Sequence, residues 1–141
     1  MNKRFTIEKE VKFKDIIASE RPAVIKIDTN GKITYANTVF GMLSGYKREE
    51  LLGRPESILR HPDMPNAIIE DMQRKLKNNE SWSGFVKFLR KDGRFFWADT
   101  FISPIREDGK VVGFILINRG VSEDIVREVK EKYETMRREE K

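Results

Sequence analysis

Apolar and polar residues alternate along five short stretches of the chain, and turn-forming residues separate these stretches. A period of two is typical of a β-strand with one buried face. The predicted strands are 23–28, 33–36, 82–89, 94–105 and 111–118. Gly31 lies between the first two strands, and the pairs Asp92-Gly93 and Asp108-Gly109 separate the last three. Asp-Gly between such stretches is a strong hairpin signal, so we expect antiparallel pairing throughout.

Between residues 37 and 76 the apolar spacing becomes helical. Gly45, Gly53 and the prolines of segment 60–65 interrupt any long helix, so the pattern predicts several short helical pieces. A fuller helix is expected at about 66–76, where apolar residues recur at helical spacing. These pieces fall between the second and third strands, and we expect them to cover one face of the sheet.

Both ends of the chain carry amphipathic segments. Apolar side chains stand among Lys and Glu at residues 5–18, where we expect a short N-terminal helix that packs on the domain. Ser122 can cap a second helix, which carries a heptad seam. The seam residues are Val126, Val129, Tyr133 and Met136. A seam of about two heptads is unstable alone, so it either packs on its own domain or continues into a longer coiled coil.

Together these elements predict one α+β domain with a five-stranded antiparallel sheet, short helices on one face, and an N-terminal and a C-terminal helix. With 141 residues, 38% of them hydrophobic, the chain can build one core. We divide it into an N-terminal helical cap at 1–20, a central domain at 21–122, and a C-terminal helix or coiled-coil start at 123–141.

The composition narrows the classes of function. The 28 basic and 23 acidic residues give a net charge of +5 on a mixed surface, which does not favour nucleic-acid binding. No cysteine is present, which excludes disulfides, thiolate catalysis and Cys-based metal sites, and the single His61 cannot form a multi-histidine metal site. No apolar stretch approaches the roughly 20 residues that cross a bilayer, so we expect no membrane insertion by this segment and a cytoplasmic location.

Several motifs resemble the PAS family. The segments I-T-Y-A-N at 33–37 and S-G-Y at 44–46, with Phe40 between them, resemble the general PAS signature. A second group of motifs is similar to the FAD-binding PAS domains of bacterial aerotaxis receptors. These motifs are E-L-L-G at 50–53, R-H-P-D-M-P at 60–65, W-S-G at 82–84, and R-K-D-G at 90–93 followed by Phe96 and Trp97. The resemblance covers about residues 23–122.

The resemblance implies a sensory module of a chemoreceptor or histidine kinase that binds FAD non-covalently and reports redox state or oxygen. It implies no enzymatic activity, and the sequence has no P-loop or nucleophile elbow. Alternatives are a PAS domain that is ligand-free or binds a small molecule and acts in dimerisation, and, less favoured, a haem gas sensor. The expected partners are a second copy, bound through the terminal helices, and a downstream signalling domain.

The expected pocket lies between the sheet and the helical pieces. Its candidate cofactor-binding residues are Asn37, Arg60, His61, Trp82, Phe88, Ala98, Thr100 and Asn118. The last five fall on one face of their strands by period two.

Most candidates have an ordinary structural alternative. Trp82 stacks on a planar cofactor or is a core tryptophan. Arg60 holds a phosphate or forms a surface ion pair. His61 contacts the cofactor, ligates haem or orders its loop. Asn37 lies near the ligand or caps a helix, and Asn118 relays a signal through its amide or bonds the local backbone.

Three features depart from the flavin-binding relatives. Phe88 stands where they carry an asparagine that reaches the flavin edge, which admits a smaller or more apolar ligand. The sequence Gly120-Val121-Ser122 replaces their usual Asp-x-Thr at the exit, so Gly120 is a candidate flexible joint. The lack of cysteine excludes the photoadduct of light-sensing flavin PAS domains.

Overall fold

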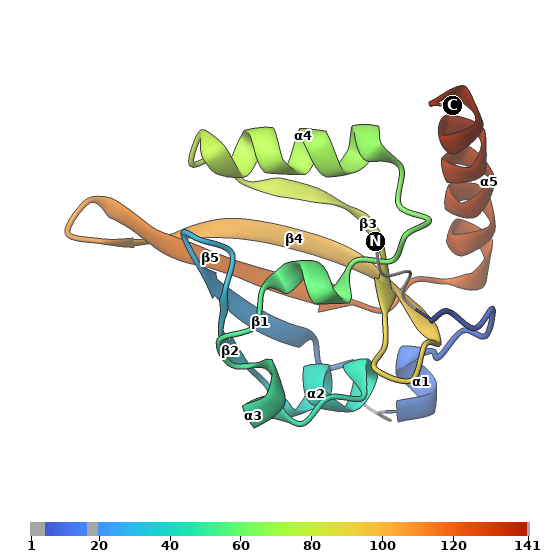
Figure 1. Ribbon diagram of the computed structural model, residues 1–141, viewed down its shortest axis with the longest axis horizontal. Coiled ribbons are helices and arrows are strands. Elements are labelled where there is room, and N and C mark those ends of the chain that lie inside the picture. The colour runs from blue at the N-terminus through green and yellow to red at the C-terminus, as the bar shows by residue number, and fades with distance from the viewer. Residues whose placement is uncertain (1–4, 17–19, 141) are drawn as a thin grey trace.

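The computed structural model describes residues 5–16 and 20–140 and has a five-stranded antiparallel sheet in the order β2-β1-β5-β4-β3 (Figure 1). The strands are β1 (Ala23–Asp28), β2 (Ile33–Ala36), β3 (Trp82–Leu89), β4 (Phe95–Glu107) and β5 (Lys110–Arg119). The predicted sheet and fold class are therefore confirmed. Asp108 and Gly109 have φ angles of 49° and 78°, the left-handed values that a tight hairpin turn between β4 and β5 requires.

One face of the sheet, here called the inner face, is covered by the helical pieces between β2 and β3. They are α2 (Thr38–Ser44), α3 (Arg48–Leu51), the 3₁₀ helix η1 (Glu56–Leu59) and α4 (Asn66–Lys77). Along the chain they cross from the β1–β2 side, where α2 and α3 lie, to the β3 side, where α4 lies (Figure 1). The predicted order, several short helical pieces followed by one longer helix, is therefore confirmed.

The register of β3 and β4 determines which side chains face this helical layer. The inner-face pairs are Trp82 with Ile102, Gly84 with Thr100, Val86 with Ala98, and Phe88 with Phe96. The alternate residues, among them Phe85, Lys87 and Trp97, point to the opposite, outer face. The period-two assignment of faces made from the sequence therefore agrees with the structure.

The N-terminal segment differs from its prediction. Among residues 5–16 a helix is present only at α1 (Phe13–Ile16), whereas residues 5–12 are irregular apart from one bridge between Glu10 and Phe95. The N–H groups of Ile7 and Val11 donate to the carbonyls of Gly93 and Phe95, each at 2.7 Å. The backbone at the start of β4 thus offers these residues strand-like partners, which outweigh a weak helical pattern. Residues 17–19 of the predicted helix lie outside the described residues.

The C-terminal helix α5 (Glu123–Glu139) lies against the outer face of the sheet. Val129 and Tyr133 are buried there, the Tyr133 hydroxyl donates to the carbonyl of Phe85 at 2.7 Å, and its ring lies 5.8 Å from that of Trp97. The sequence left two possibilities for the heptad seam. In the structure the seam packs on its own domain. Among the described residues, no helix combines the length and apolarity needed to cross a membrane.

Candidate functional site

A small cavity lies between the inner face of the sheet and the wall formed by η1, the following loop and α4. Its volume is about 30 Å³, room for roughly two water molecules. The lining residues are Glu56, Leu59, Arg60, Met64, Ile68, Ile69, Met72, Trp82, Val86, Phe88, Thr100, Ile102 and Leu116. The wall is mainly apolar, with polar groups from η1 and from β4.

Trp82 forms one side of this cavity and is 4% exposed. Its indole N–H donates to the Asp71 carboxylate of α4 at 3.1 Å, so the ring links β3 to the helical wall. The ring lies over Gly84, where an added Cβ would stand 2.5 Å from a ring carbon. The W-S-G motif therefore has a steric basis, because Gly84 leaves the space that the indole occupies.

Phe88 closes another side of the cavity. Its ring stacks on that of Phe96, with centroids 5.0 Å apart, and meets the edge of Phe40 at 5.9 Å. These rings form a packed aromatic cluster that holds β3, β4 and α2 together. A side chain here with a hydrogen-bonding amide would face the same space, so Phe88 makes this wall apolar.

Two buried polar side chains lie on the inner face beside the cavity. The Thr100 hydroxyl donates to Oδ1 of Asn118 at 2.7 Å, and Nδ2 of Asn118 donates to the carbonyl of Ala23 at 3.0 Å. Both residues are fully buried, and only Thr100 lines the cavity. Asn118 thus joins β4, β5 and β1 through bonds that already use both of its amide groups.

Charged groups reach the cavity from η1 and from the residue that follows it. The carboxylate of Glu56 and the guanidinium of Arg60 lie 3.8 Å apart, with side chains 20% and 33% exposed. Burial raises the pKa of the Glu56 carboxyl, and the positive charge of Arg60 acts in the opposite direction. This end of the cavity can accept a hydrogen bond at Glu56 and offer a forked donor at Arg60.

Comparison with known proteins agrees with this fold. The sequence model of the PAS fold matches residues 12–121. The chain belongs to the PAS family.

Among its curated relatives is the aerotaxis receptor of Escherichia coli (strain K12), which is 35% identical over 120 residues, 85% of this chain and 24% of the receptor. The biofilm dispersion protein BdlA of Pseudomonas aeruginosa is 36% identical over 88 residues, 60% of this chain and 21% of that protein. This PAS chain thus spans about a quarter or less of these relatives.

A solved structure of a light-oxygen-voltage domain, studied with a flavin analogue, superposes with a TM-score of 0.71 and 29% identity. The match covers 81% of this chain and 87% of that one.

The structure separates the candidate residues by position. Arg60, Trp82, Phe88 and Thr100 line the PAS cavity, and Asn118 lies beside it. Ala98 is buried in the core without lining the cavity. Glu56 and Met64 line the cavity but were not among the candidates. The i,i+4 spacing of Glu56 and Arg60 could have indicated the first, whereas Met64 depends on the path of its loop.

Asn37 has the role of a helix cap. Its Oδ1 accepts hydrogen bonds from the N–H groups of Phe40 and Val24 at 2.9 and 3.0 Å, and Nδ2 donates to the carbonyl of Pro22 at 3.0 Å. The side chain therefore begins α2 and fixes it to β1. Asn37 does not line the cavity. Of its two expected roles, the structure therefore shows helix capping and not a position beside the ligand.

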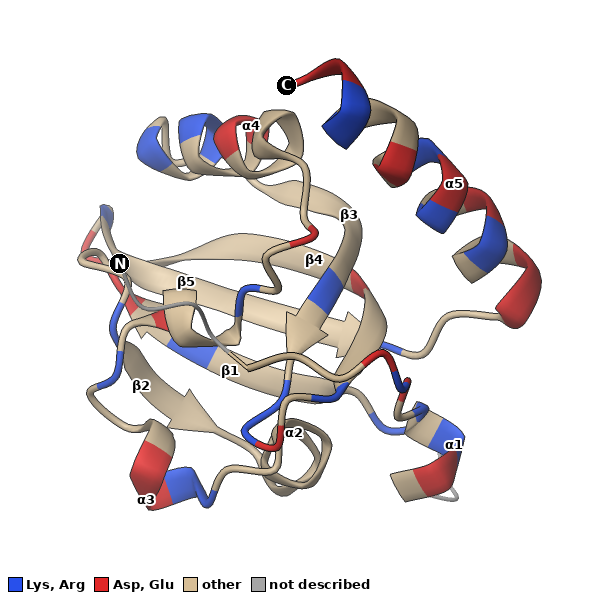
Figure 2. Cartoon of the chain, turned by 45° about the vertical axis from the view of Figure 1, so that its right-hand side comes forward, with Lys and Arg blue, Asp and Glu red and all other residues tan. Residues whose placement is uncertain are grey.

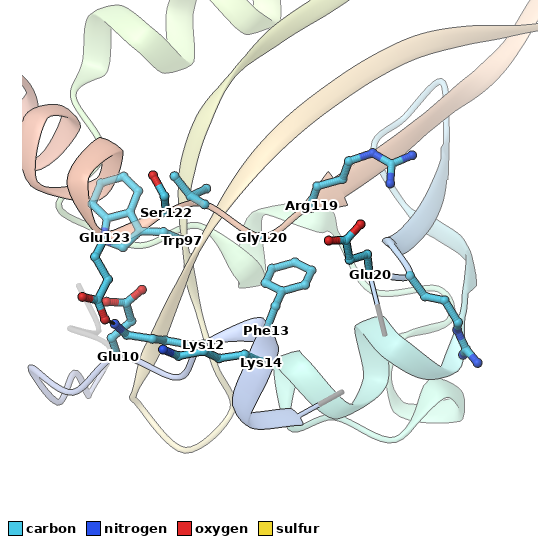
Figure 3. A pocket seen from close by; sticks show the side chains of 12 residues that line it. Glu10, Lys12, Phe13, Lys14, Glu20, Trp97, Arg119, Gly120, Ser122 and Glu123 are labelled. Atoms are coloured by element: carbon cyan, nitrogen blue, oxygen red, sulfur yellow. Dashed lines mark hydrogen bonds and ion pairs between the residues drawn. The ribbon is translucent and has the colours of Figure 1, made fainter. Parts of the chain in front are cut away.

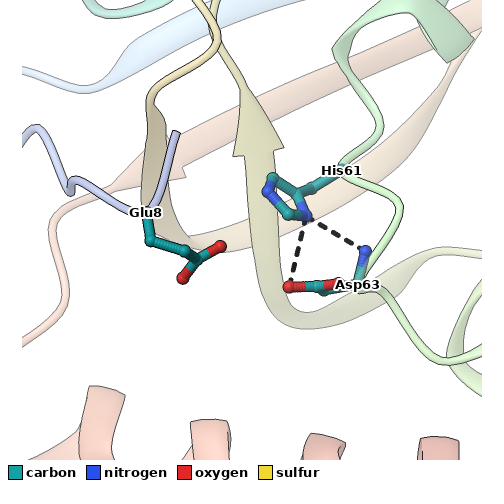
Figure 4. A group of neighbouring side chains, drawn as sticks. All are labelled: Glu8, His61 and Asp63. Carbon is teal, nitrogen blue, oxygen red and sulfur yellow. Dashed lines mark hydrogen bonds and ion pairs between the residues drawn. The ribbon is translucent and has the colours of Figure 1, made fainter. Parts of the chain in front are cut away.

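His61 is buried, at 1% exposure, but it lies at the edge of β3 on the outer side of the sheet rather than in the cavity (Figure 4). Its Nδ1 accepts the N–H of Asp63 at 3.0 Å, so Nε2 carries the ring proton. Nε2 has no hydrogen-bond partner within residues 5–16 and 20–140. Burial, followed by the charge of Lys87, lowers the pKa of His61 to about 4. In this position His61 orders its own loop, which is one of the three roles expected for it.

Charged side chains gather around His61 beneath the N-terminal segment. The Lys87 ammonium lies 3.2 Å from the Asp63 carboxylate, 3.8 Å from that of Glu8, and 4.2 Å from the centre of the Phe95 ring. Glu8, His61 and Asp63 have the spacing of a metal-ligand set, but Lys87 already supplies a cation to both carboxylates. We therefore assign this cluster a structural role. Figure 4 shows the three groups around the end of β3.

A larger hollow of about 490 Å³ lies between the N-terminal segment and the junction of β5 with α5 (Figure 3). Its rim carries charges of both signs, and the Phe13 ring lies near its centre, close enough that a Cβ on Gly120 would stand 3.3 Å from that of Phe13. Lys12 and Glu123 form an ion pair across one side. The lining has both acidic and basic side chains, so its charge alone does not indicate one class of ligand.

Proposed function

We propose that this PAS domain is the sensory module of a larger signalling protein, in which the cavity receives the ligand and α5 carries the response to the next domain. The observation that carries the proposal is the apolar cavity enclosed between the sheet and a helical wall made of the R-H-P-D-M-P loop and α4. The relatives named as an aerotaxis receptor and a two-component system protein support a signalling role. The Thr100 hydroxyl is hydrogen-bonded to Asn118 rather than to a base, which does not favour catalysis.

FAD, bound non-covalently as a reporter of redox state or oxygen, is the first candidate ligand. The chemistry of the walls fits it at two places: Trp82 offers a flat ring for an isoalloxazine, and Arg60 offers a forked donor for a phosphate. The bound flavin would supply reversible electron transfer. A volume of about 30 Å³ is too small for so large a group, so FAD binding requires the cavity wall to move, and α4 is the part that we expect to move away from the sheet.

The test of the flavin proposal is the visible spectrum of the purified chain and its titration with FAD. Flavin bands in the protein fraction are expected, and Phe88→Asn should bind FAD more tightly because it adds an amide to the cavity wall. The matched control is Phe101→Asn, because Phe101 lies on the outer face and is 45% exposed. A chain that stays colourless with excess FAD, with and without Phe88→Asn, would reject the cofactor.

The second candidate is a small, mainly apolar molecule, and the stacking of Phe88 on Phe96 favours it because the rings leave so little room. Mass spectrometry of an organic extract of the folded protein would identify such a molecule. Haem is the third outcome, detected by a Soret band. It has less support because His61 lies outside the cavity and uses Nδ1 in its own loop.

A homodimer through the terminal helices, with a downstream domain after α5 and a cytoplasmic location, is also part of the proposal. Burial of Val129 and Tyr133 within one chain means that pairing through α5 must first release them from the sheet. Light scattering at micromolar concentration should show a dimer that Val129→Glu with Tyr133→Glu abolishes. A monomer well above micromolar concentration would mean that α5 serves its own domain in this chain.

A further inference from the structure

The N-terminus of α4 is capped by a residue from the far end of the chain. Its own N-cap residue is Pro65, whose side chain accepts no hydrogen bond. The first two N–H groups of the helix, those of Asn66 and Ala67, donate to the two carboxylate oxygens of Glu140 at 3.0 and 2.8 Å. A carboxylate at this position satisfies unpaired donors and interacts favourably with the helix dipole.

A second contact lies one turn earlier in α5. Arg137 donates to the main-chain carbonyl of Asp63 at 2.6 Å, and its guanidinium lies 3.8 Å from the Asp63 carboxylate. That carboxylate in turn accepts a hydrogen bond from Lys87 of β3 at 3.2 Å. Burial alone would raise the pKa of the Asp63 carboxyl, but Lys87 and Arg137 hold it below its ordinary value.

The segment held by these two contacts is also a wall of the cavity. Met64, Ile68 and Ile69, which lie between or next to the contacted residues, all line it. Met64 accepts a hydrogen bond at its sulfur from the N–H of Lys87, which holds the loop against the edge of β3. The end of α5 and the contents of the cavity therefore act on the same short stretch of chain from opposite sides.

We propose that the contacts of Arg137 with Asp63 and of Glu140 with Asn66 and Ala67 form a latch between α5 and the cavity wall. Because of this latch, docking of α5 and filling of the cavity oppose each other. Any ligand larger than the present volume of about 30 Å³ pushes α4 away from the sheet and so pulls Asn66 and Ala67 from Glu140. Coupling of this kind is reciprocal, so release of the end of α5 makes the cavity easier to fill. The inference rests on the proposed sensory function for its ligand, but the latch can be tested without one.

The first test removes the cap. Glu140→Ala leaves the N–H groups of Asn66 and Ala67 without their carboxylate, and amide exchange measured by NMR on the full chain should become about fivefold faster there, the usual effect of losing a cap. Exchange in the last turn of α5 should rise with it. Glu139→Ala is the matched control, since it removes the same charge from an exposed neighbour. Unchanged exchange at Asn66 and Ala67, or an equal response to both variants, would overturn the latch.

The second test fills the cavity without a ligand. Val86→Phe adds a ring to the cavity wall and should speed amide exchange in the last two turns of α5 about fivefold, whereas Val112→Phe, at a 40% exposed site, should not. Faster exchange in α4 without any change in α5 would overturn the coupling. If Val86→Phe does not fold, the Glu140→Ala comparison alone decides.

Titration with FAD gives a third readout, in which Glu140→Ala should bind about fivefold more tightly than Glu139→Ala. Equal FAD affinities in the two variants would count against the coupling. Absence of FAD binding in both variants would count against the proposed cofactor, while the two exchange experiments would still decide the latch.

Discussion

The two faces of β3 show how differently one strand can be buried. On the inner face Val86 and Phe88 lie in apolar contacts, and the nearby polar pair Thr100–Asn118 is satisfied within the sheet. On the outer face Lys87 is also buried, at 5% exposure, but beneath separate chain segments that bring charges to it. The inner face is thus maintained by packing, whereas on the outer face buried rings such as Trp97 and Tyr133 are combined with hydrogen bonds and ion pairs, which respond to pH and to movement of the chain ends.

Figure 2 extends the comparison to the layers that cover the two faces. Charges of both signs run along α5, over the outer face, whereas charged residues are sparse along the strands. The helix packs on the domain through Val129 and Tyr133, with Val126 and Met136 partly buried beside them, and polar contacts hold both of its ends. We therefore expect substitutions on the inner face to change the stability of the whole domain, and those on the outer face to act first on α5 and the N-terminal segment.

The largest effect is expected on the inner face. Trp82→Ala removes a buried ring and its bond to Asp71, and should lower the free energy of unfolding by about 3–5 kcal/mol. Urea unfolding followed by circular dichroism measures it. Phe101→Ala, on the outer face at 45% exposure, is the control and should change stability by less than about 1 kcal/mol. Similar losses for the two variants would remove the distinction between the faces.

The next largest change in stability is expected on the outer face, where it depends on pH through His61. The pKa of His61 is about 4 in the folded chain, below its ordinary value of about 6.5. The unfolded chain therefore takes up the proton first, and stability present above pH 6.5 is lost as the pH falls toward 4, by up to about 3 kcal/mol. A protonated His61 would also repel Lys87 and Arg137, two of the charges that face it.

Urea unfolding at pH 7.5 and pH 4.5 tests this expectation, with His61→Gln as the comparison. The loss between the two pH values should be larger in the unmodified chain than in the variant, because the carboxylates, Asp63 among them, are the same in both. Equal losses would mean that His61 titrates normally and that its burial has no effect on its charge.

The fold could be predicted from local signals because those signals agree with one another. Asp108-Gly109 adopts the left-handed turn that the dipeptide favours, and the period-two pattern gave the faces of β3 and β4 correctly. Residues 5–12 were predicted wrongly, since their non-helical path depends on hydrogen bonds to Gly93 and Phe95, which are distant in sequence. Local spacing carries no information about such partners.

The candidate site was predicted mainly where strands supply it, and Arg60, which follows η1, is the cavity-lining candidate that came from the R-H-P-D-M-P motif instead. Trp82, Phe88 and Thr100 line the cavity because alternation along a strand determines direction. His61 and Asn37 belong to a loop and to a strand–helix junction, where the direction of a side chain depends on the tertiary path. The part of Glu140 in capping α4 had no sequence signal, because it joins residues more than 70 positions apart.

The smallest change in stability is expected when a single hydrogen bond on the outer face is removed. Tyr133→Phe keeps the ring beside Trp97 but removes the hydroxyl that donates to the Phe85 carbonyl, so unfolding free energy at pH 7.5 should fall by about 1 kcal/mol. Tyr35→Phe, at a 42% exposed position, is the matched control and should have no measurable effect.

The titration of Tyr133 gives an independent check on the same bond. Burial raises the pKa of Tyr133 to about 12. The unfolded chain therefore loses this proton first, and the stability due to neutral Tyr133 is lost as the pH rises from about 10 to 12. Absorbance at alkaline pH should show one late-ionising tyrosine that Tyr133→Phe removes and Tyr35→Phe retains. If all tyrosines ionise together, α5 leaves the sheet before Tyr133 titrates, and the outer face is held less firmly than its contacts indicate.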